Sequence, residues 1–223
     1  MVAVLVDLGG PKGYPQGMFS GIIEAVEPIT SHRALDQAHL IVIRRPSTFD
    51  DLSVGDSIAV NGVCLTVESF DLDTMTFTLG FETLTVLGDS FKSWFLKPVN
   101  LERSLAFGAR VHGHFVTGHV EAMLEVVKSE ALGENWLLSA LLPTDLKKFC
   151  WKKGSLAFNG VSLTINSVQN NVVEVCLIPE TQKRTNLALV MVGEKLCFEP
   201  DSFAKAIANA LESGLICSGG SDV

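Results

Sequence analysis

The chain is 223 residues long, carries a formal net charge of -8 and has an isoelectric point near 5.1. This acidic balance argues against a nucleic-acid partner, because binding to a phosphate backbone is driven by clustered Lys and Arg side chains. Hydrophobic residues make up 47% of the sequence and charged residues 19%, which suits a globular protein with a sizeable core and argues against a disordered chain. The length fits one large domain or two domains of about 100 residues each.

The chain begins with an apolar run, MVAVLVDLGG. The run has no basic start, and Asp7 interrupts it too early for a signal peptide or a membrane span. The five cysteines are odd in number, widely spaced and without a CxxC pair, which is typical of reduced thiols in a cytosolic protein. They are Cys64, Cys150, Cys176, Cys197 and Cys217. We therefore expect a soluble cytoplasmic protein without a membrane partner.

Two stretches of the sequence are similar, which indicates an internal repeat. Residues 54–67 read VGDSIAVNGVCLTV, and residues 152–165 read KKGSLAFNGVSLTI. This alignment pairs Asn61 with Asn159, 98 residues apart.

Two further matches lie at nearly the same spacing. FET at 81–83 is again 98 residues from PET at 179–181, and SGIIEA at 20–25 is 97 residues from TGHVEA at 117–122. Collinear matches at one spacing predict two domains of the same fold. The predicted parts are an N-terminal extension (1–17), a first repeat (18–114), a second repeat (115–211), which includes the start of a C-terminal helix (201–215), and a tail (216–223).

Within each repeat, short runs rich in Val, Ile, Thr and Phe predict β-strands. Examples are SIAVNGVCLTV, TMTFTL, SLTINSV and VVEVCLI. Asn61-Gly62 and Asn159-Gly160 lie between two such runs and predict tight reversals, because Gly tolerates positive φ. We expect an all-β protein with about six strands in each repeat, arranged as a small barrel or a sandwich.

Residues 201–215 break the strand pattern and predict a helix. Phe203, Ile207 and Leu211 recur at i, i+4 and i+8, Asp201 or Ser202 is a suitable N-cap, and Gly214 a suitable stop. The apolar stripe is compatible with packing on the chain's own barrels or with oligomerisation.

Polar residues recur at matching strand positions. Cys64 and Thr66 in the first repeat, like Ser162 and Thr164 in the second, are two residues apart and therefore point to the same strand face. Such a face is either solvent-exposed or lines a pocket, and its repetition favours a pocket. The exchange of Cys64 for Ser162 predicts unequal roles, since a thiol is the better nucleophile when its pKa is lowered.

Three of the five histidines lie close together, at His112, His114 and His119. No Cys or acidic ligand accompanies them at a metal-site spacing, so acid–base chemistry or hydrogen bonding to a heterocycle is favoured over metal binding. Glu82-Thr83 and Glu180-Thr181 follow apolar strands at equivalent places, where they form either exposed turns or a contact to the amide edge of a heterocycle.

Lys153 corresponds to Gly55 in the first repeat, so it has no repeated partner and is compatible with an ordinary solvated lysine. The sequence contains no GxGxxG, P-loop, GxSxG or HExxH motif, which argues against dinucleotide enzymes, NTPases, α/β-hydrolases and zincins.

The motifs resemble those of the riboflavin synthase family, which is built from lumazine-binding repeats. They are MFSGII (18–23), GDSIAVNGVCLTV (55–67), VNLERS (99–104), GHFVTGHVE (113–121), KGSLAFNGVSLTI (153–165) and LIPETQKRTNL (177–187). The resemblance implies two tandem six-stranded Greek-key barrels followed by a C-terminal α-helix.

The resemblance also implies an activity. Members of that family are transferases that move a four-carbon unit between two molecules of 6,7-dimethyl-8-ribityllumazine, which yields riboflavin and 5-amino-6-ribitylaminouracil, and they use no cofactor. They are typically homotrimers held by the C-terminal helices, with each active site between barrels of adjacent subunits. Association with lumazine synthase is a further partner that the resemblance suggests.

The family's site residues carry over by position. The resemblance implies catalytic roles for Cys64, His119, Ser162, His114 and Asp201. It implies that the first pocket uses Gly21, Ile22, Ile23, Ser57, Cys64, Leu65, Thr66, Thr78, Leu79, Gly80, Phe81, Glu82, Thr83, Gly118, His119 and Val120, and that Phe19 and His114 lie close to the reaction centre. It implies that the second uses Lys153, Ser162, Leu163, Thr164, Cys176, Leu177, Ile178, Pro179, Glu180 and Thr181, with Asp201 beside it.

The sequence departs from the family at its start and in one loop. Family members usually begin at the Met-Phe pair, which is Met18-Phe19 here, so either translation starts at Met18 or the extension leaves the site by another route. FKSWFLKPVN at 91–100 lacks the Gly expected before the VN strand, which we expect to change only a loop. The main alternative function is that of a non-catalytic lumazine- or flavin-binding antenna protein; a purely structural barrel would leave the matching polar positions unexplained.

Overall fold

The computed structural model describes residues 17–215 of the chain, so the predicted tail and most of the predicted extension lie outside the described residues. The first repeat contains β1 (Ala25–Glu27), β2 (Ile29–Leu35), β3 (Ala38–Arg44), β4 (Ser57–Val60), β5 (Val63–Thr66), β6 (Ser69–Phe70), β7 (Thr74–Leu79), α1 (Phe81–Leu87), the 3-10 helix η1 (Gly88–Phe95) and β8 (Val99–Arg103). The second contains β9 (Ala122–Leu132), β10 (Asn135–Leu141), η2 (Lys147–Phe149), β11 (Ser155–Phe158), β12 (Val161–Gln169), β13 (Val172–Leu177), α2 (Pro179–Arg184), η3 (Asn186–Leu189), β14 (Lys195–Pro200) and α3 (Ser202–Glu212).

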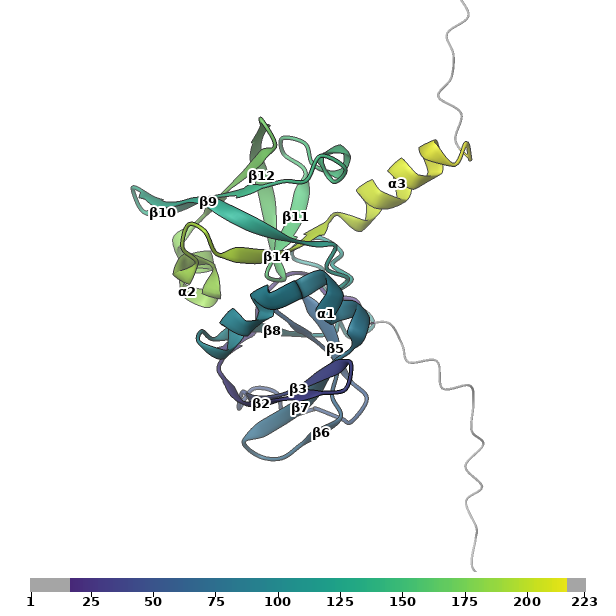
Figure 1. Cartoon of the computed structure of the whole chain (residues 1–223), viewed down its shortest axis with the longest axis vertical. Helices are drawn as coiled ribbons and strands as arrows, with labels where there is room; N and C mark the ends of the chain where they lie inside the picture. The colour runs from purple at the N-terminus through teal and green to yellow at the C-terminus, as the bar shows by residue number, and fades with distance from the viewer. Residues whose placement is uncertain (1–16, 216–223) are drawn as a thin grey trace, which may run out of the picture.

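The second repeat is a closed six-stranded barrel, as the sequence predicts. Its antiparallel strands pair in the order β10-β13-β12-β11-β14-β9, and β9 closes the ring on β10. The chain crosses from β10 to β11 without pairing the two, which is a Greek-key connection. Figure 1 shows this barrel stacked on the first repeat, with α3 projecting away from both.

The first repeat follows the same paths with two of its strands interrupted. Its strands pair in two sheets, β1-β8-β4-β5 and β2-β3-β7-β6. Pro28, which has no N–H to donate, separates β1 from β2 where the second repeat has the continuous strand β9. Val67-Glu68 separates β5 from β6 where β12 continues, although the Glu68 amide still donates to the Thr76 carbonyl at 3.0 Å. Eight assigned strands therefore occupy six strand paths.

Strict alternation of side chains builds both cores. In β7 and β13 every second residue is buried, as expected for strands with one face on a core. Phe49 and Phe77 fill the first barrel, and Phe158 and Phe198 the second.

The two Asn-Gly turns lie back to back between the repeats. Both residues of each turn have positive φ (46° and 81° for Asn61-Gly62, 46° and 79° for Asn159-Gly160), as a type I′ hairpin turn requires. A Cβ on Gly62 would lie 2.6 Å from the amide nitrogen of Gly160, and one on Gly160 would lie 2.8 Å from that of Gly62. The prediction of tight reversals is confirmed, and the glycines also allow the repeats to approach each other.

The first residues of each repeat also meet at this junction. Phe19 and Val116 exchange backbone hydrogen bonds of 2.8 and 3.0 Å, and both side chains are buried against Ala59 and Ala157. The segments that begin the repeats thus lie side by side rather than at opposite ends of the molecule.

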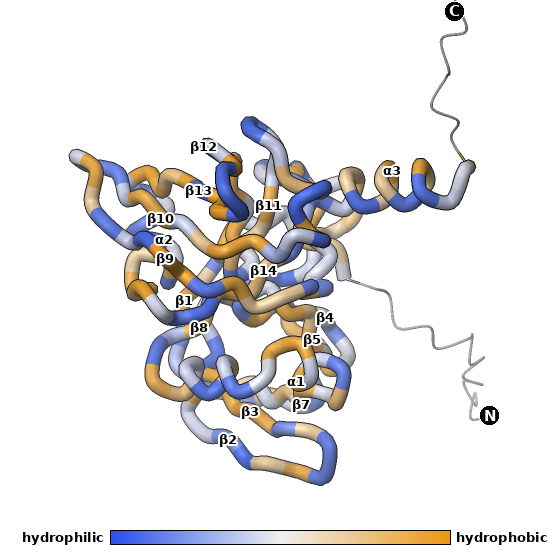
Figure 2. Tube along the Cα trace, turned by 45° about the horizontal axis from the view of Figure 1, so that its top comes forward, coloured by the Kyte–Doolittle hydropathy of each residue, from blue (hydrophilic) through white to orange (hydrophobic). Residues whose placement is uncertain are grey.

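Helix α3 forms where predicted. The Asp201 carboxylate accepts hydrogen bonds from the amides of Phe203 and Ala204, and Gly214 follows the helix with φ of +72°. Phe203, Ile207 and Leu211 are 61%, 57% and 48% exposed, so the predicted apolar stripe is covered only in part by its own chain. The Phe203 ring packs edge-on against Phe115, with ring centroids 5.7 Å apart. Hydrophobic residues recur along the projecting helix in Figure 2.

The four cysteines in the described part of the chain are free thiols, while Cys217 lies outside it. Among residues 17–215, no helix has the length and apolar character needed to cross a bilayer.

Candidate active site: two matching cavities

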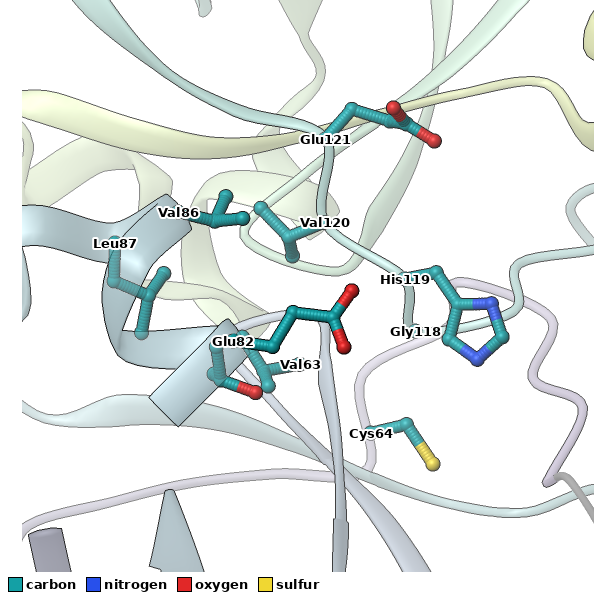
Figure 3. A pocket seen from close by; sticks show the side chains of 10 residues that line it. Val63, Cys64, Glu82, Val86, Leu87, Gly118, His119, Val120 and Glu121 are labelled. Atoms are coloured by element: carbon teal, nitrogen blue, oxygen red, sulfur yellow. The ribbon is translucent and has the colours of Figure 1, made fainter. Parts of the chain in front are cut away.

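A cavity of about 440 Å³, here named the first cavity, lies between β5, α1 and the segment that begins the second repeat (Figure 3). The side chains of Cys64, Glu82 and His119 surround it in Figure 3. It is lined by Val63, Cys64, Glu82, Thr83, Val86, Leu87, Gly118, His119, Val120 and Glu121. Six of these residues were predicted from the sequence.

A second cavity, of about 140 Å³, occupies the equivalent place on the second repeat. It is lined by Gly21, Ile22, Ile23, Val161, Ser162, Glu180, Thr181, Arg184 and Thr185. Each of these residues lies 97 or 98 positions from a residue that lines the first cavity, so the two cavities are repeat copies. They share no lining residue.

Each cavity is completed by the segment that begins the other repeat. The Gly118 carbonyl accepts a hydrogen bond from the Cys64 amide at 2.9 Å, and the Gly21 carbonyl accepts one from the Ser162 amide at 2.9 Å. The placement of Gly21–Ile23 in the first pocket is therefore wrong: these residues line the second cavity. The order of the motifs along the chain favoured a pocket within the first repeat, whereas the strand that pairs with Gly21 belongs to the second repeat.

Glu82 and Thr83 lie in the first turn of α1 rather than at the end of a strand. Gly80 follows β7 in an extended conformation and is the N-cap residue of the helix, which begins at Phe81. In the second repeat, Pro179 begins α2. Proline suits the first position of a helix, because an N–H at that position would have no hydrogen-bond partner within the helix.

The Cys64 thiol is half-buried beside the first cavity. Burial raises the pKa of this thiol, hydrogen bonds from Ser57 and Gly17 act in the opposite direction, and the Glu199 charge raises the pKa further. The thiol is consequently protonated near neutral pH, which makes it a hydrogen-bond donor or a proton source rather than a standing thiolate.

Ser162, which corresponds to Cys64, is paired with a histidine instead. His114 Nδ1 lies 2.7 Å from Ser162 Oγ, while its buried Nε2 has no partner among the described residues. Burial lowers the pKa of His114, partly offset by the charge of Asp201, so the imidazole is neutral at pH 7. Asp201 itself caps α3.

The three clustered histidines separate in the structure. His119 lines the first cavity, His114 lies on Ser162, and His112 lines a hollow beside Arg103 and Arg110. Within residues 17–215, no three His, Cys, Asp or Glu side chains gather as a metal site would require.

Several predicted residues lie near the cavities without lining them. Leu65, Leu79, Leu163 and Leu177 point into the barrel cores, so that only their backbone groups are free to contact a ligand. Phe19 packs between the repeats against Cys64. The remaining predicted residues, Ser57, Thr66, Thr78, Gly80, Phe81, Lys153, Thr164, Cys176, Ile178 and Pro179, are half-buried or exposed outside both linings.

The sequence reasoning missed the helical walls of the cavities. Val86 and Leu87 follow Thr83 at i+3 and i+4, on the same face of α1, and Arg184 and Thr185 hold the matching positions in the second repeat. A helical reading of residues 81–87 would have found them. These pairs make the first cavity more apolar on this side than the second.

The fold and the paired cavities define a duplicated barrel protein with one equivalent cavity on each repeat. A model of the lumazine binding domain matches residues 20–104 and 117–201. The chain belongs to the lumazine-binding domain family.

The relatives agree with this assignment. Riboflavin synthase of Mycobacterium tuberculosis is 37% identical over 206 residues, covering 88% of this chain and 99% of the relative. Riboflavin synthase of Bacillus subtilis is 36% identical over 84% of this chain and 87% of its own length, and that of Schizosaccharomyces pombe 35% identical over 88% and 95%. The solved structure of LumP complexed with riboflavin has a similar fold, with a TM-score of 0.74 and 22% identity over 82% of this chain and 98% of that chain.

Proposed function

We propose that the protein is a riboflavin synthase, a transferase that converts two molecules of 6,7-dimethyl-8-ribityllumazine into riboflavin and 5-amino-6-ribitylaminouracil by moving a four-carbon unit. The observation that carries the proposal is the pair of equivalent cavities with unequal polar groups, Cys64 and His119 in one and Ser162 in the other. Two identical substrates that react with each other need two similar sites that treat them differently. Relatives named riboflavin synthase at 34–37% identity over most of the chain support this activity.

Rate acceleration in this reaction would come mainly from holding two heterocycles face to face, since orientation alone supplies a large part of many barriers. The substrate's 7-methyl group is acidic because the ring delocalises the resulting anion, so one molecule acts as carbon nucleophile and the other as electrophile. The protonated Cys64 thiol and His119 would serve one molecule, and the neutral His114–Ser162 pair the other.

The reacting molecules would meet between subunits. The two cavities of one chain share no lining residue, which favours contact between a cavity of one copy and a cavity of a neighbouring copy. The exposed stripe of Phe203, Ile207 and Leu211 on α3 supports assembly through this helix. We propose a homotrimer in the cytoplasm; association with lumazine synthase rests on the family resemblance alone.

The decisive experiment is to incubate the purified full chain with 6,7-dimethyl-8-ribityllumazine and to follow riboflavin by its absorbance. Catalytic formation of riboflavin is expected. Tight binding without riboflavin would identify a lumazine-binding antenna protein instead.

Cys64→Ser should lower kcat by about 10-fold or more, on the scale of acid–base catalysis, while the dissociation constant for the substrate changes little. The hydroxyl retains a hydrogen bond but is a much weaker acid than the thiol. Cys150→Ala, in the core of the second barrel, is the control and should keep kcat. Equal losses in kcat and binding for Cys64→Ser would reduce the thiol to a contact residue.

A further inference from the structure

Two buried carboxylates lie at the junction of the repeats and have no place yet in the proposed reaction. Glu102 in β8 is 3% exposed, and Glu199 in β14 is 4% exposed. Neither forms an ion pair with a residue of the described part of the chain. Burial raises the pKa of both carboxyl groups, and for Glu199 hydrogen bonds and the charge of Lys205 act in the opposite direction. Burying a carboxylate without an ion pair is costly, so hydrogen bonds must stabilise each charge.

Each carboxylate is held by the segment that begins its own repeat. Glu199 accepts hydrogen bonds from the Thr117 amide (2.7 Å), the Thr117 hydroxyl (2.9 Å) and the Gly118 amide (3.0 Å). Glu102 accepts from the Ser20 amide (2.7 Å), the Ser20 hydroxyl (2.8 Å) and the Gly21 amide (3.0 Å). Both oxygens of each carboxylate are used, and bonds to a charged acceptor are stronger than neutral ones.

These hydrogen bonds fix the backbone that completes the cavities. Gly118 has φ of +78°, and its carbonyl accepts from the Cys64 amide at 2.9 Å. The next residue, His119, lines the first cavity beside Cys64. A shift of this short segment would therefore move the histidine and the wall against the thiol together.

We infer that Glu199 is a positioning residue for the first cavity: through Thr117 and Gly118 it holds His119 and the Cys64 strand in one arrangement. Glu102 holds the equivalent segment at Ser162 and does not act on Cys64. The consequence for catalysis rests on the function proposed above, whereas the positioning itself does not.

The matched variants Glu199→Gln and Glu102→Gln test this inference. Glutamine keeps the shape of glutamate and one acceptor oxygen, but an NH₂ group replaces the second oxygen. This NH₂ group would face the N–H of Gly118 or Gly21, and because both groups are donors, that hydrogen bond is lost. In the full-length protein without substrate, the alkylation rate of Cys64 by iodoacetamide is measured against pH, with the modified cysteine located by mass spectrometry.

We expect Glu199→Gln to speed Cys64 alkylation several-fold and to move its pH profile toward lower pH, because the segment loosens and a nearby negative charge is removed. Glu102→Gln should leave both quantities at the wild-type level. His119, Glu82 and Glu121 are unchanged in both variants and act as a common background.

An unchanged Cys64 profile in Glu199→Gln would overturn the inference, as would an equal change in Glu102→Gln. If Glu199→Gln does not fold, Thr117→Ala, which removes one of the three bonds, should give a smaller acceleration of Cys64 alkylation, and no acceleration would count against the inference.

In assays with substrate, Glu199→Gln should lower kcat about 10-fold with little change in KM. A wild-type chain that forms no riboflavin would refute the proposed function without affecting the alkylation result.

Discussion

Gly118 shows how closely the second repeat approaches the first. A Cβ added there would lie 2.5 Å from the Cys64 Cβ and 2.8 Å from the Cys64 amide nitrogen. Gly21 meets Ser162 in the same way, at 2.6 and 2.7 Å. At both positions the absence of a side chain, as much as the positive φ, allows the segment to close the cavity.

Gly118→Ala should therefore destabilise the protein by about 3 kcal/mol or more, which combines left-handed strain of about 1–2 kcal/mol with a clash against backbone. Gly133→Ala is the matched control, because Gly133 also has positive φ (59°) but open space around its Cβ position. Its cost should be limited to about 1–2 kcal/mol. Urea unfolding of both variants measures the difference, and equal costs would mean that the contact with Cys64 is unimportant.

His114 gives the stability a defined pH dependence. Burial lowers the pKa of this imidazole, so between its ordinary and its lowered pKa the unfolded chain binds more protons than the folded one. Stability should rise with pH through this window and be lost as the pH falls. In His114→Asn, which keeps a polar atom near the Nδ1 position, the loss of melting temperature between about pH 7.5 and about pH 5.5 should be smaller than in the wild type. A wild-type-sized loss would show that His114 does not contribute.

At the scale of elements, a network of buried asparagines joins the turns of both repeats. The Asn186 side-chain NH₂ donates to Asn61 Oδ1 at 2.9 Å and to the Pro98 carbonyl at 3.0 Å, and Asn186 Oδ1 accepts from the Asn159 side chain at 3.2 Å. Asn100 accepts from the Asn186 amide at 2.8 Å. Polar groups buried in this way are stable only when their partners are present.

Asn186→Ala removes the hydrogen bond of the buried Asn159 side-chain NH₂ and one hydrogen bond to the half-buried Pro98 carbonyl, while Asn61 Oδ1 keeps the Asn100 amide as a donor. It should therefore cost about 1–4 kcal/mol of unfolding free energy. Asn166→Ala, at an exposed position of β12, should change it by less than about 0.5 kcal/mol. Thermal unfolding of the two variants provides the comparison, and similar melting temperatures would contradict a structural role for the network.

The sequence predicts the elements better than their partners. Strands such as β7 and β13 follow from strict alternation, and α3 follows from its i, i+4 stripe and its cap, because both patterns are local. The helix α1 was missed, since FETLTVL is only seven residues long and rich in Thr and Val, which favour strands.

The site shows the same division. Spacing between repeats correctly marks Cys64, Ser162, Glu82 and Glu180 as cavity residues, because a duplicated pocket repeats in sequence. It cannot show that Gly21 lies on Ser162 of the other repeat, since that contact depends on how the barrels stack. Nor does spacing explain why Lys153 takes the position that Gly55 holds in the first repeat. In the structure both residues have positive φ (72° and 98°), so this position requires a left-handed backbone, in which Lys153 is strained.

For the whole molecule, α3 is the element that extends beyond the barrels. Lys205 pairs with Glu121, which lines the first cavity, and Lys148 pairs with Glu212, while Ile207 and Leu211 of the apolar stripe remain about half exposed. The helix is thus anchored at both ends by ion pairs, and its exposed apolar side chains are the surface through which we propose that the chain assembles.

Ile207→Lys should convert the proposed homotrimer to monomers and reduce riboflavin formation at least about 10-fold, because a buried charge at an interface costs several kcal/mol and a monomer lacks the cavity of a neighbouring copy that the proposed reaction uses. Ala206→Lys, at the neighbouring exposed position, is the control. Light scattering coupled to size-exclusion chromatography gives the mass of each variant. A wild-type chain that is already monomeric, yet active, would refute assembly through α3.

The segment that begins each repeat completes the cavity of the other repeat, and this arrangement bears on how the two cavities came to differ. Two copies of a single repeat, related by a true twofold axis through the Gly62–Gly160 contact, would have the same mutual dependence as the halves of this chain, each closing the other's cavity. As separate identical subunits they could only carry identical cavities. Once joined in one polypeptide, each half could change alone, so that Cys64 and Ser162, or Val86 and Arg184, became free to differ.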